Sequence, residues 1–276
     1  MRSFKAFAFV TVASVLLAGS LRAQWIGQVK WGVEGLDWRS GVNGASSKYS
    51  EGPGGTVRQW NVYTSPYFAQ FKITNSPSTS LLPPPAGSST WGPVVDIFCV
   101  DFTHSANTST AGYNAYFTNL STFADLGVKT RQGGQAGLDN YLAAAFLSQK
   151  IREFGVNTPA AKDMNGAIWQ IMSGNPFYRY TNSDLAPSPL YTYTAADRWN
   201  SIGIGYWMLV ARAAVLENRV DAGDWVVVTQ RNADGSIGAS QEYLTQVTPE
   251  PATMLLLGTG LVVMLMAAGA LRRPTV

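Results

Sequence analysis

The chain has 276 residues and a formal net charge of +3 at pH 7, from 20 Lys+Arg and 17 Asp+Glu. Five of the basic residues and one of the acidic residues lie within residues 1–23 or after residue 249, which leaves 15 basic and 16 acidic residues between them, a net of −1. Neutralisation of phosphates by Lys and Arg supplies most nucleic-acid affinity, so this near-neutral body argues against a nucleic-acid partner.

Residues 1–23 have the composition of a secretory signal peptide. Arg2 and Lys5 form a basic start, a short apolar run follows, and small residues precede two alternative cleavage points, after Ser20 or after Ala23. We therefore expect signal peptidase to cut here and the following residues to be exported.

Residues 24–247 are long enough for one large domain. Cys99 is the sole cysteine, so no internal disulfide can form within the chain. One cysteine and one histidine cannot complete a zinc shell, and no phosphate loop, dinucleotide fingerprint or nucleophile elbow is present. The sequence predicts no metal and no cofactor.

Strands are expected first and helices later along this body. Aromatic and β-branched residues alternate between Trp25 and about Phe71, and VVDIFCVDFTH at residues 94–104 reads as a further strand. Capping and spacing predict helices over residues 138–155, 158–174 and 194–218. Asp234-Gly235 predicts a tight hairpin turn between two late strands. The expected fold class is α+β with β structure dominant.

Cys99 and His104, each single in the sequence, raise the hypothesis of a catalytic cysteine–histidine pair. On an intact strand they would lie on opposite faces and roughly 16 Å apart, so only a turn after Phe102 could bring them together. A cysteine hydrolase therefore remains an alternative, and we expect a protein without enzymatic activity.

The tail resembles the PEP-CTERM sorting signal. Pro249-Glu250-Pro251 is followed by an uncharged run over residues 252–271 and by Arg272 and Arg273. Twenty apolar residues span a bilayer core, and the positive-inside rule keeps the arginines cytoplasmic. The resemblance implies an exosortase as partner, with single-pass anchoring at residues 252–271, the body outside the cytoplasm, and later transfer to the cell surface or extracellular matrix.

The body is similar to the thioester domains of bacterial surface adhesins. FCVD at residues 98–101 matches the region of their reactive cysteine, and Ala167, Ile168 and Trp169 match the motif that follows their glutamine. The resemblance implies a thioester-like pair of Cys99 and Asn165. Asn165 is one methylene shorter than glutamine, so we expect the fold to be retained and the covalent bond to be absent.

Three hypotheses follow for residues 24–247, with residues 248–276 as the sorting signal. The first is a non-enzymatic surface or matrix protein, with a polysaccharide or another surface molecule as candidate ligand. The second is a covalent adhesin acting through Cys99, and the third is the cysteine hydrolase. The tryptophans are candidate sugar-stacking residues, although most are expected to pack in the core: Trp25, Trp31, Trp38, Trp60, Trp91, Trp199 and Trp207.

Overall fold

The computed structural model describes residues 25–31, 46–51, 58–75, 91–106, 112–180, 199–200 and 202–247. The predicted signal peptide and the predicted membrane span lie outside these residues. Within the described residues, the longest and most apolar helices fall short of what is needed to cross a membrane.

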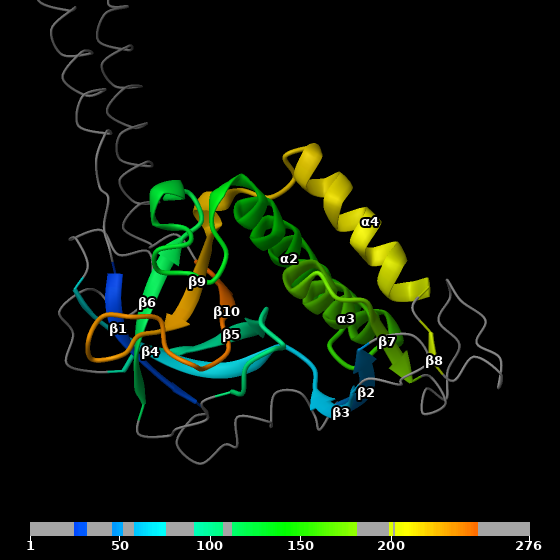
Figure 1. Ribbon diagram of the computed structural model, residues 1–276, viewed down its shortest axis with the longest axis horizontal. Helices are drawn as coiled ribbons and strands as arrows, with labels where there is room; N and C mark the ends of the chain where they lie inside the picture. The colour runs from blue at the N-terminus through cyan, green and yellow to red at the C-terminus, as the bar shows by residue number, and fades with distance from the viewer. Residues whose placement is uncertain are drawn as a thin grey trace, which may run out of the picture.

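Six antiparallel strands close into a barrel in the order β1-β4-β5-β10-β9-β6 (Figure 1). Their bounds are β1 Trp25–Trp31, β4 Tyr67–Asn75, β5 Val94–Cys99, β6 Tyr113–Asn119, β9 Trp225–Gln230 and β10 Tyr243–Gln246. Inside the barrel, aromatic rings pack edge to face, as with Phe71 and Phe117, whose centroids lie 5.1 Å apart. Closure pairs every strand on both sides.

A second sheet has four strands in the order β3-β2-β7-β8, and its strand β7 contacts α3, one of three packed helices. The strand bounds are β2 Ser46–Glu51, β3 Arg58–Tyr63, β7 Phe177–Tyr180 and β8 Trp199–Asn200, and the helices are α2 Gly134–Phe154, α3 Pro159–Ser173 and α4 Ile202–Leu216. Two short 3-10 helices, η3 Phe123–Asp125 and η4 Ala222–Asp224, complete the described elements. The architecture is a mixed α+β fold, as the residue pattern predicted.

The first two predicted helices are confirmed together with their caps. Helix α3 starts behind Thr158, whose side chain accepts a hydrogen bond from the Ala161 N–H, and it ends at Gly174 in a left-handed conformation. Helix α2 begins at Gly134, earlier than predicted, and ends at Gly155.

The third predicted helix is wrong at its start. Trp199 and Asn200 form the short strand β8, and α4 begins only at Ile202. Gly203 and Gly205 lie inside the helix, and a Cβ on Gly203 would come within 2.2 Å of the Asp163 carboxylate. Close packing of α4 on α3 therefore accounts for the glycine at position 203.

The predicted hairpin around Asp234-Gly235 is confirmed. Gly235 has φ of 88°, Arg231 and Ile237 form a bridge, and β9 and β10 pair on either side of the loop. The strand predicted over residues 94–104 ends at Cys99, and residues 101–104 bend away from it.

Strand direction determines which segments of the chain lie at each end of the barrel. Because every neighbouring pair is antiparallel, the start of β1 and the end of β10 lie at the same end of the barrel. Cys99, the last residue of β5, pairs with Tyr243, the first residue of β10, so both lie toward the opposite end. The chain turns there into Asp101 and the residues that surround it.

Candidate functional site

Cys99 is buried, with 1 % of its surface exposed. Its thiol donates to the Asp101 carbonyl (3.5 Å), and its N–H donates to Ser65 Oγ (2.9 Å). Burial, reinforced by the negative charge of Asp101, raises the pKa of the Cys99 thiol to about 12. The thiolate needed for nucleophilic attack is therefore strongly disfavoured at neutral pH.

Asn165 is completely buried on α3, and both polar atoms of its side chain are hydrogen bonded. Its Oδ1 accepts from the Ser65 N–H (3.0 Å), and its Nδ2 donates to the Ala161 carbonyl (2.9 Å). Ser65 therefore joins the two residues of the predicted thioester-like pair: its N–H binds Asn165 and its hydroxyl binds Cys99. A covalent bond between Cys99 and Asn165 stays a prediction.

The motif after Asn165 packs into the core against the Cys99 strand. Ala167, Ile168 and Trp169 are buried, and the Trp169 indole N–H donates to the Cys99 carbonyl (3.3 Å). The Trp169 ring also lies on Phe102, with centroids 4.6 Å apart. These residues fix α3 to the end of β5.

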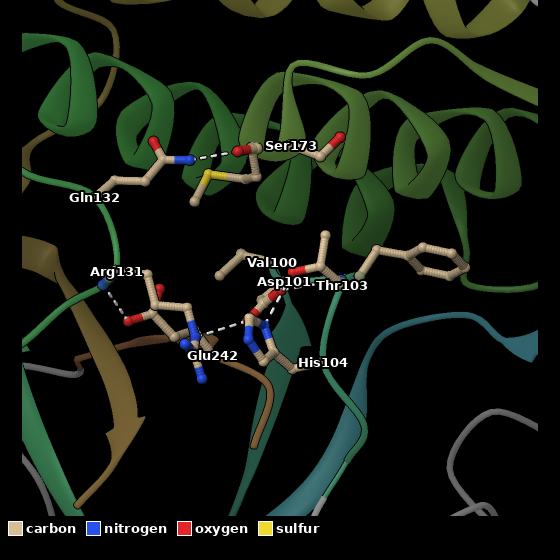
Figure 2. A pocket seen from close by; sticks show the side chains of 10 residues that line it. Val100, Asp101, Thr103, His104, Arg131, Gln132, Ser173 and Glu242 are labelled. Carbon is tan, nitrogen blue, oxygen red and sulfur yellow. Dashed lines mark hydrogen bonds and ion pairs between the residues drawn. The ribbon is translucent and has the colours of Figure 1, made fainter. Parts of the chain in front are cut away.

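A cavity of about 330 Å³ opens beside this junction, between the loop after β5 and the segment that leads into α2 (Figure 2). Its lining residues are Val100, Asp101, Phe102, Thr103, His104, Arg131, Gln132, Met172, Ser173 and Glu242. They come from segments that are far apart in the sequence. Among them, only His104 is a site residue that the sequence predicts.

Asp101 organises the charged wall of this cavity. Its Oδ1 accepts from the Thr103 hydroxyl (2.7 Å) and N–H (3.0 Å), and its Oδ2 lies 2.7 Å from His104 Nδ1 and 2.8 Å from Arg131 Nε. Asp101 is nearly buried, whereas His104 keeps 34 % of its side chain exposed. The carboxylate thus holds the imidazole and the guanidinium in place at the cavity surface.

This arrangement gives His104 a partner other than the predicted one. The chain does bend after Phe102, as the cysteine–histidine hypothesis required, but His104 Nδ1 faces Asp101 while the Cys99 thiol is bonded to a backbone carbonyl. The observed contacts therefore connect each residue to Asp101, through the carboxylate for His104 and through the main chain for Cys99.

Glu242 lines the cavity and binds the Arg131 segment. It is fully buried and accepts hydrogen bonds from the Arg131 N–H (2.7 Å), the Tyr141 hydroxyl (2.6 Å) and the Thr229 hydroxyl (2.8 Å). The Arg131 Nη2 atom donates to the carbonyls of Gly238 and Ser240, both at 2.7 Å. Arg131 is therefore held at both its backbone and its side chain.

We expect replacement of Glu242 by glutamine to flatten the pH dependence of stability. Burial raises the pKa of the Glu242 carboxyl above its usual value, although its hydrogen bonds and Arg131 act in the other direction. The contribution of this group to the free energy of unfolding is greatest below its unfolded pKa of about 4.3 and is lost as pH rises through the folded pKa. The loss is at most about 1.4 kcal/mol per pH unit. Denaturant unfolding between pH 4 and 8 should show this loss for the natural chain and not for Glu242→Gln. Parallel profiles would contradict the expectation.

Among the candidate sugar-stacking tryptophans whose side chains are described, most are buried in the core. Trp31 and Trp207 are buried, and Trp91 is partly exposed beneath the Lys30 ammonium, 4.9 Å from the ring centroid. The side chains of Trp25, Trp38, Trp60 and Trp199 lie outside the described part. Within the described residues, no group of three or more His, Cys, Asp or Glu side chains is arranged to hold a metal ion.

Comparison with known proteins informs the tail rather than the body. Residues 247–273 match the PEP-CTERM protein-sorting motif. This motif implies export, sorting to the cell surface and processing by an exosortase. No curated protein and no solved structure matches the chain. The resemblance of the body to thioester domains gains no support from these comparisons and stays a prediction.

Proposed function

We propose that this PEP-CTERM protein is a non-enzymatic binding protein of the cell surface or extracellular matrix, and that the cavity beside Asp101 is its ligand site. The proposed ligand is a neutral polysaccharide segment. The observation that carries the proposal is the cluster of Asp101, His104 and Arg131 that lines a cavity, with the Asp101 carboxylate in contact with both the imidazole and the guanidinium. The PEP-CTERM match supports a location where such a ligand would be met.

The chemistry of the cavity favours a polyhydroxylated neutral ligand. The Arg131 guanidinium is paired with Asp101, and Glu242 is a second carboxyl in the lining, so the wall offers hydrogen-bonding groups without an unpaired arginine to attract a strong anion. The partly exposed Phe102 ring adds an apolar surface beside them. Ligand sites commonly combine apolar lining with a few fixed polar groups in this way.

We expect His104→Ala to weaken binding of neutral oligosaccharides by roughly tenfold, which corresponds to the loss of one or two well-placed hydrogen bonds. The measurement is isothermal titration of the full chain in detergent, first with neutral oligosaccharides and then with extracellular polysaccharide from the producing cells. Ser121→Ala, at an exposed position directly after β6 and at the end of the barrel remote from the cavity, is the matched control and should bind as the natural chain does. Equal affinities for both variants, or no binding by the natural chain, would contradict the cavity assignment.

A covalent adhesin is the second proposed function, supported by the convergence of Cys99 and Asn165 on Ser65. Formation of a thioester joins the cysteine sulfur to the side-chain carbonyl carbon of asparagine and releases ammonia. We expect most of the protein to lack the thioester. Both the oxygen and the nitrogen of the asparagine amide are hydrogen bonded, and the thiol donates a hydrogen bond to the Asp101 carbonyl.

Intact-protein mass spectrometry tests this expectation directly. The processed protein should have the mass that its remaining sequence predicts, and the unfolded protein should titrate one free thiol. A mass lower by one ammonia would instead establish the covalent adhesin, provided that methylamine then adds its own mass, by opening the thioester to an N-methylamide and a free thiol, and that Cys99→Ala shows neither change. Titration of the unfolded protein matters because Cys99 is buried in the folded protein whether or not it is bonded.

A further inference from the structure

One face of α4 is apolar and open to solvent. Leu209 is 71 % exposed and Leu216 is 83 % exposed, and Ile202 and Tyr206 are 64 % and 43 % exposed on the same side. The buried residues of α4 point the other way, toward α2 and α3: Gly203, Ile204, Trp207, Ala211 and Ala214. Figure 1 shows α4 on the outer side of the helical layer, away from the barrel.

The spacing of this face is that of a coiled-coil seam. Ile202, Tyr206, Leu209, Ala213 and Leu216 are separated by four, three, four and three residues. This alternation keeps a stripe aligned with a second helix that crosses at a shallow angle, and a stripe of this kind packs against a copy of itself. Exposed apolar stripes are also uncommon on soluble monomers.

The charges beside the seam select the orientation of the pair. Arg212 lies on α4, and Glu217 directly follows its last residue, with its N–H still bonded to the Ala213 carbonyl (2.9 Å). Helical geometry places the two on opposite sides of the stripe, five residues apart. In a parallel pair of helices, these are the flanking positions at which a residue of one helix meets the residue five positions later on the other. In an antiparallel pair, flanking positions of the same kind face each other, so Arg212 would not meet Glu217 of the other copy. We propose that α4 is the homodimerisation surface of this protein and that the two copies pack in parallel.

The interface is sized for a weak dimer. Helix α4 has 15 residues, about 22 Å of helix, so the seam covers only two heptads. An interface this small falls in the transient class, and we expect dissociation in the micromolar range or weaker. The Arg212 and Glu217 contacts would be exposed, and Glu217 would exchange its present ion pair with Arg219 (2.9 Å) for one across the dimer. The proposal is independent of the ligand assigned to the cavity.

Disulfide trapping tests the seam and its orientation. In the full chain in detergent, Leu209→Cys should cross-link to its own copy under mild oxidation, because equivalent seam positions lie side by side in a parallel pair. Ala136→Cys, exposed on α2, is the matched control and should stay monomeric. The native Cys99 is buried and does not interfere. Equal cross-linking of the two variants would overturn the proposal.

Sedimentation velocity of charge variants gives the second test. Arg212→Glu should weaken self-association by roughly two- to thirtyfold, and the double variant Arg212→Glu with Glu217→Arg should restore it. Leu209→Asp should remain folded, because the side chain is exposed, and should be monomeric at all concentrations. If Leu209→Asp associates like the natural chain, another surface or the tail causes the association. Failure of the double variant to recover would refute the parallel arrangement.

Discussion

Replacing Asp163 with alanine is expected to lower the free energy of unfolding by about 3–5 kcal/mol, the range for a buried ion pair that loses one partner. Asp163 on α3 lies 2.7 Å from Arg179 on β7, with 3 % and 0 % of the two side chains exposed. The substitution removes the Asp163 carboxylate from a buried guanidinium. Urea-induced unfolding followed by tryptophan fluorescence measures the effect.

The matched control is the Asp125–Lys129 pair, which joins η3 to the turn after it at 2.8 Å and is more exposed. Asp125→Ala should cost no more than about 1 kcal/mol, because water screens an exposed pair and solvates the remaining charge. Similar losses for the two variants would show that burial of the Asp163–Arg179 pair does not govern its energetic importance.

The second large effect is expected for Trp169→Ala, at about 3–5 kcal/mol. The Trp169 ring is 1 % exposed and contacts the rings of Tyr49 (4.9 Å between centroids) and Phe102 (4.6 Å). Its removal creates a cavity between α3 and the Cys99 strand and leaves the Cys99 carbonyl without the indole donor. Denaturant unfolding of the variant gives the loss.

Trp169→Phe separates packing from hydrogen bonding. It keeps an aromatic ring but removes the indole N–H, so we expect a loss of about half that of Trp169→Ala. Because Phe102 rests on Trp169 and also lines the cavity, Trp169→Ala should weaken oligosaccharide binding while Trp169→Phe should largely preserve it. Identical binding by all three proteins would show that the cavity does not depend on this ring.

The local elements could be predicted because their signals are contained in short stretches of sequence. Thr158 and Gly174 mark the ends of α3 through hydrogen bonds and a backbone conformation that involve only neighbouring residues. Gly235 likewise marks a turn through its positive φ. The start of α4 was missed because Trp199 and Asn200 pair with β7, and pairing with a distant strand leaves no local signal.

The candidate site was less predictable because its residues meet only after folding. His104 stood out as the single histidine, but no site role was predicted for Arg131 or Glu242, and Glu242 lies 111 residues from the backbone N–H that it binds. The sequence likewise contains no local signal for Ser65, which hydrogen bonds to both Cys99 and Asn165. Closure of the barrel could not be deduced from strand patterns, since alternation is compatible with open and closed sheets alike.

The direction of the barrel strands has a consequence for how the protein is displayed. The chain enters β1 and leaves β10 at one end of the barrel, whereas the Cys99–Asp101 turn and Glu242 are at the other. A tether that starts beyond Val247 therefore pulls on the end remote from the cavity. The proposed ligand cavity therefore faces away from the point of attachment, and we expect the proposed ligand to bind equally well before and after exosortase processing.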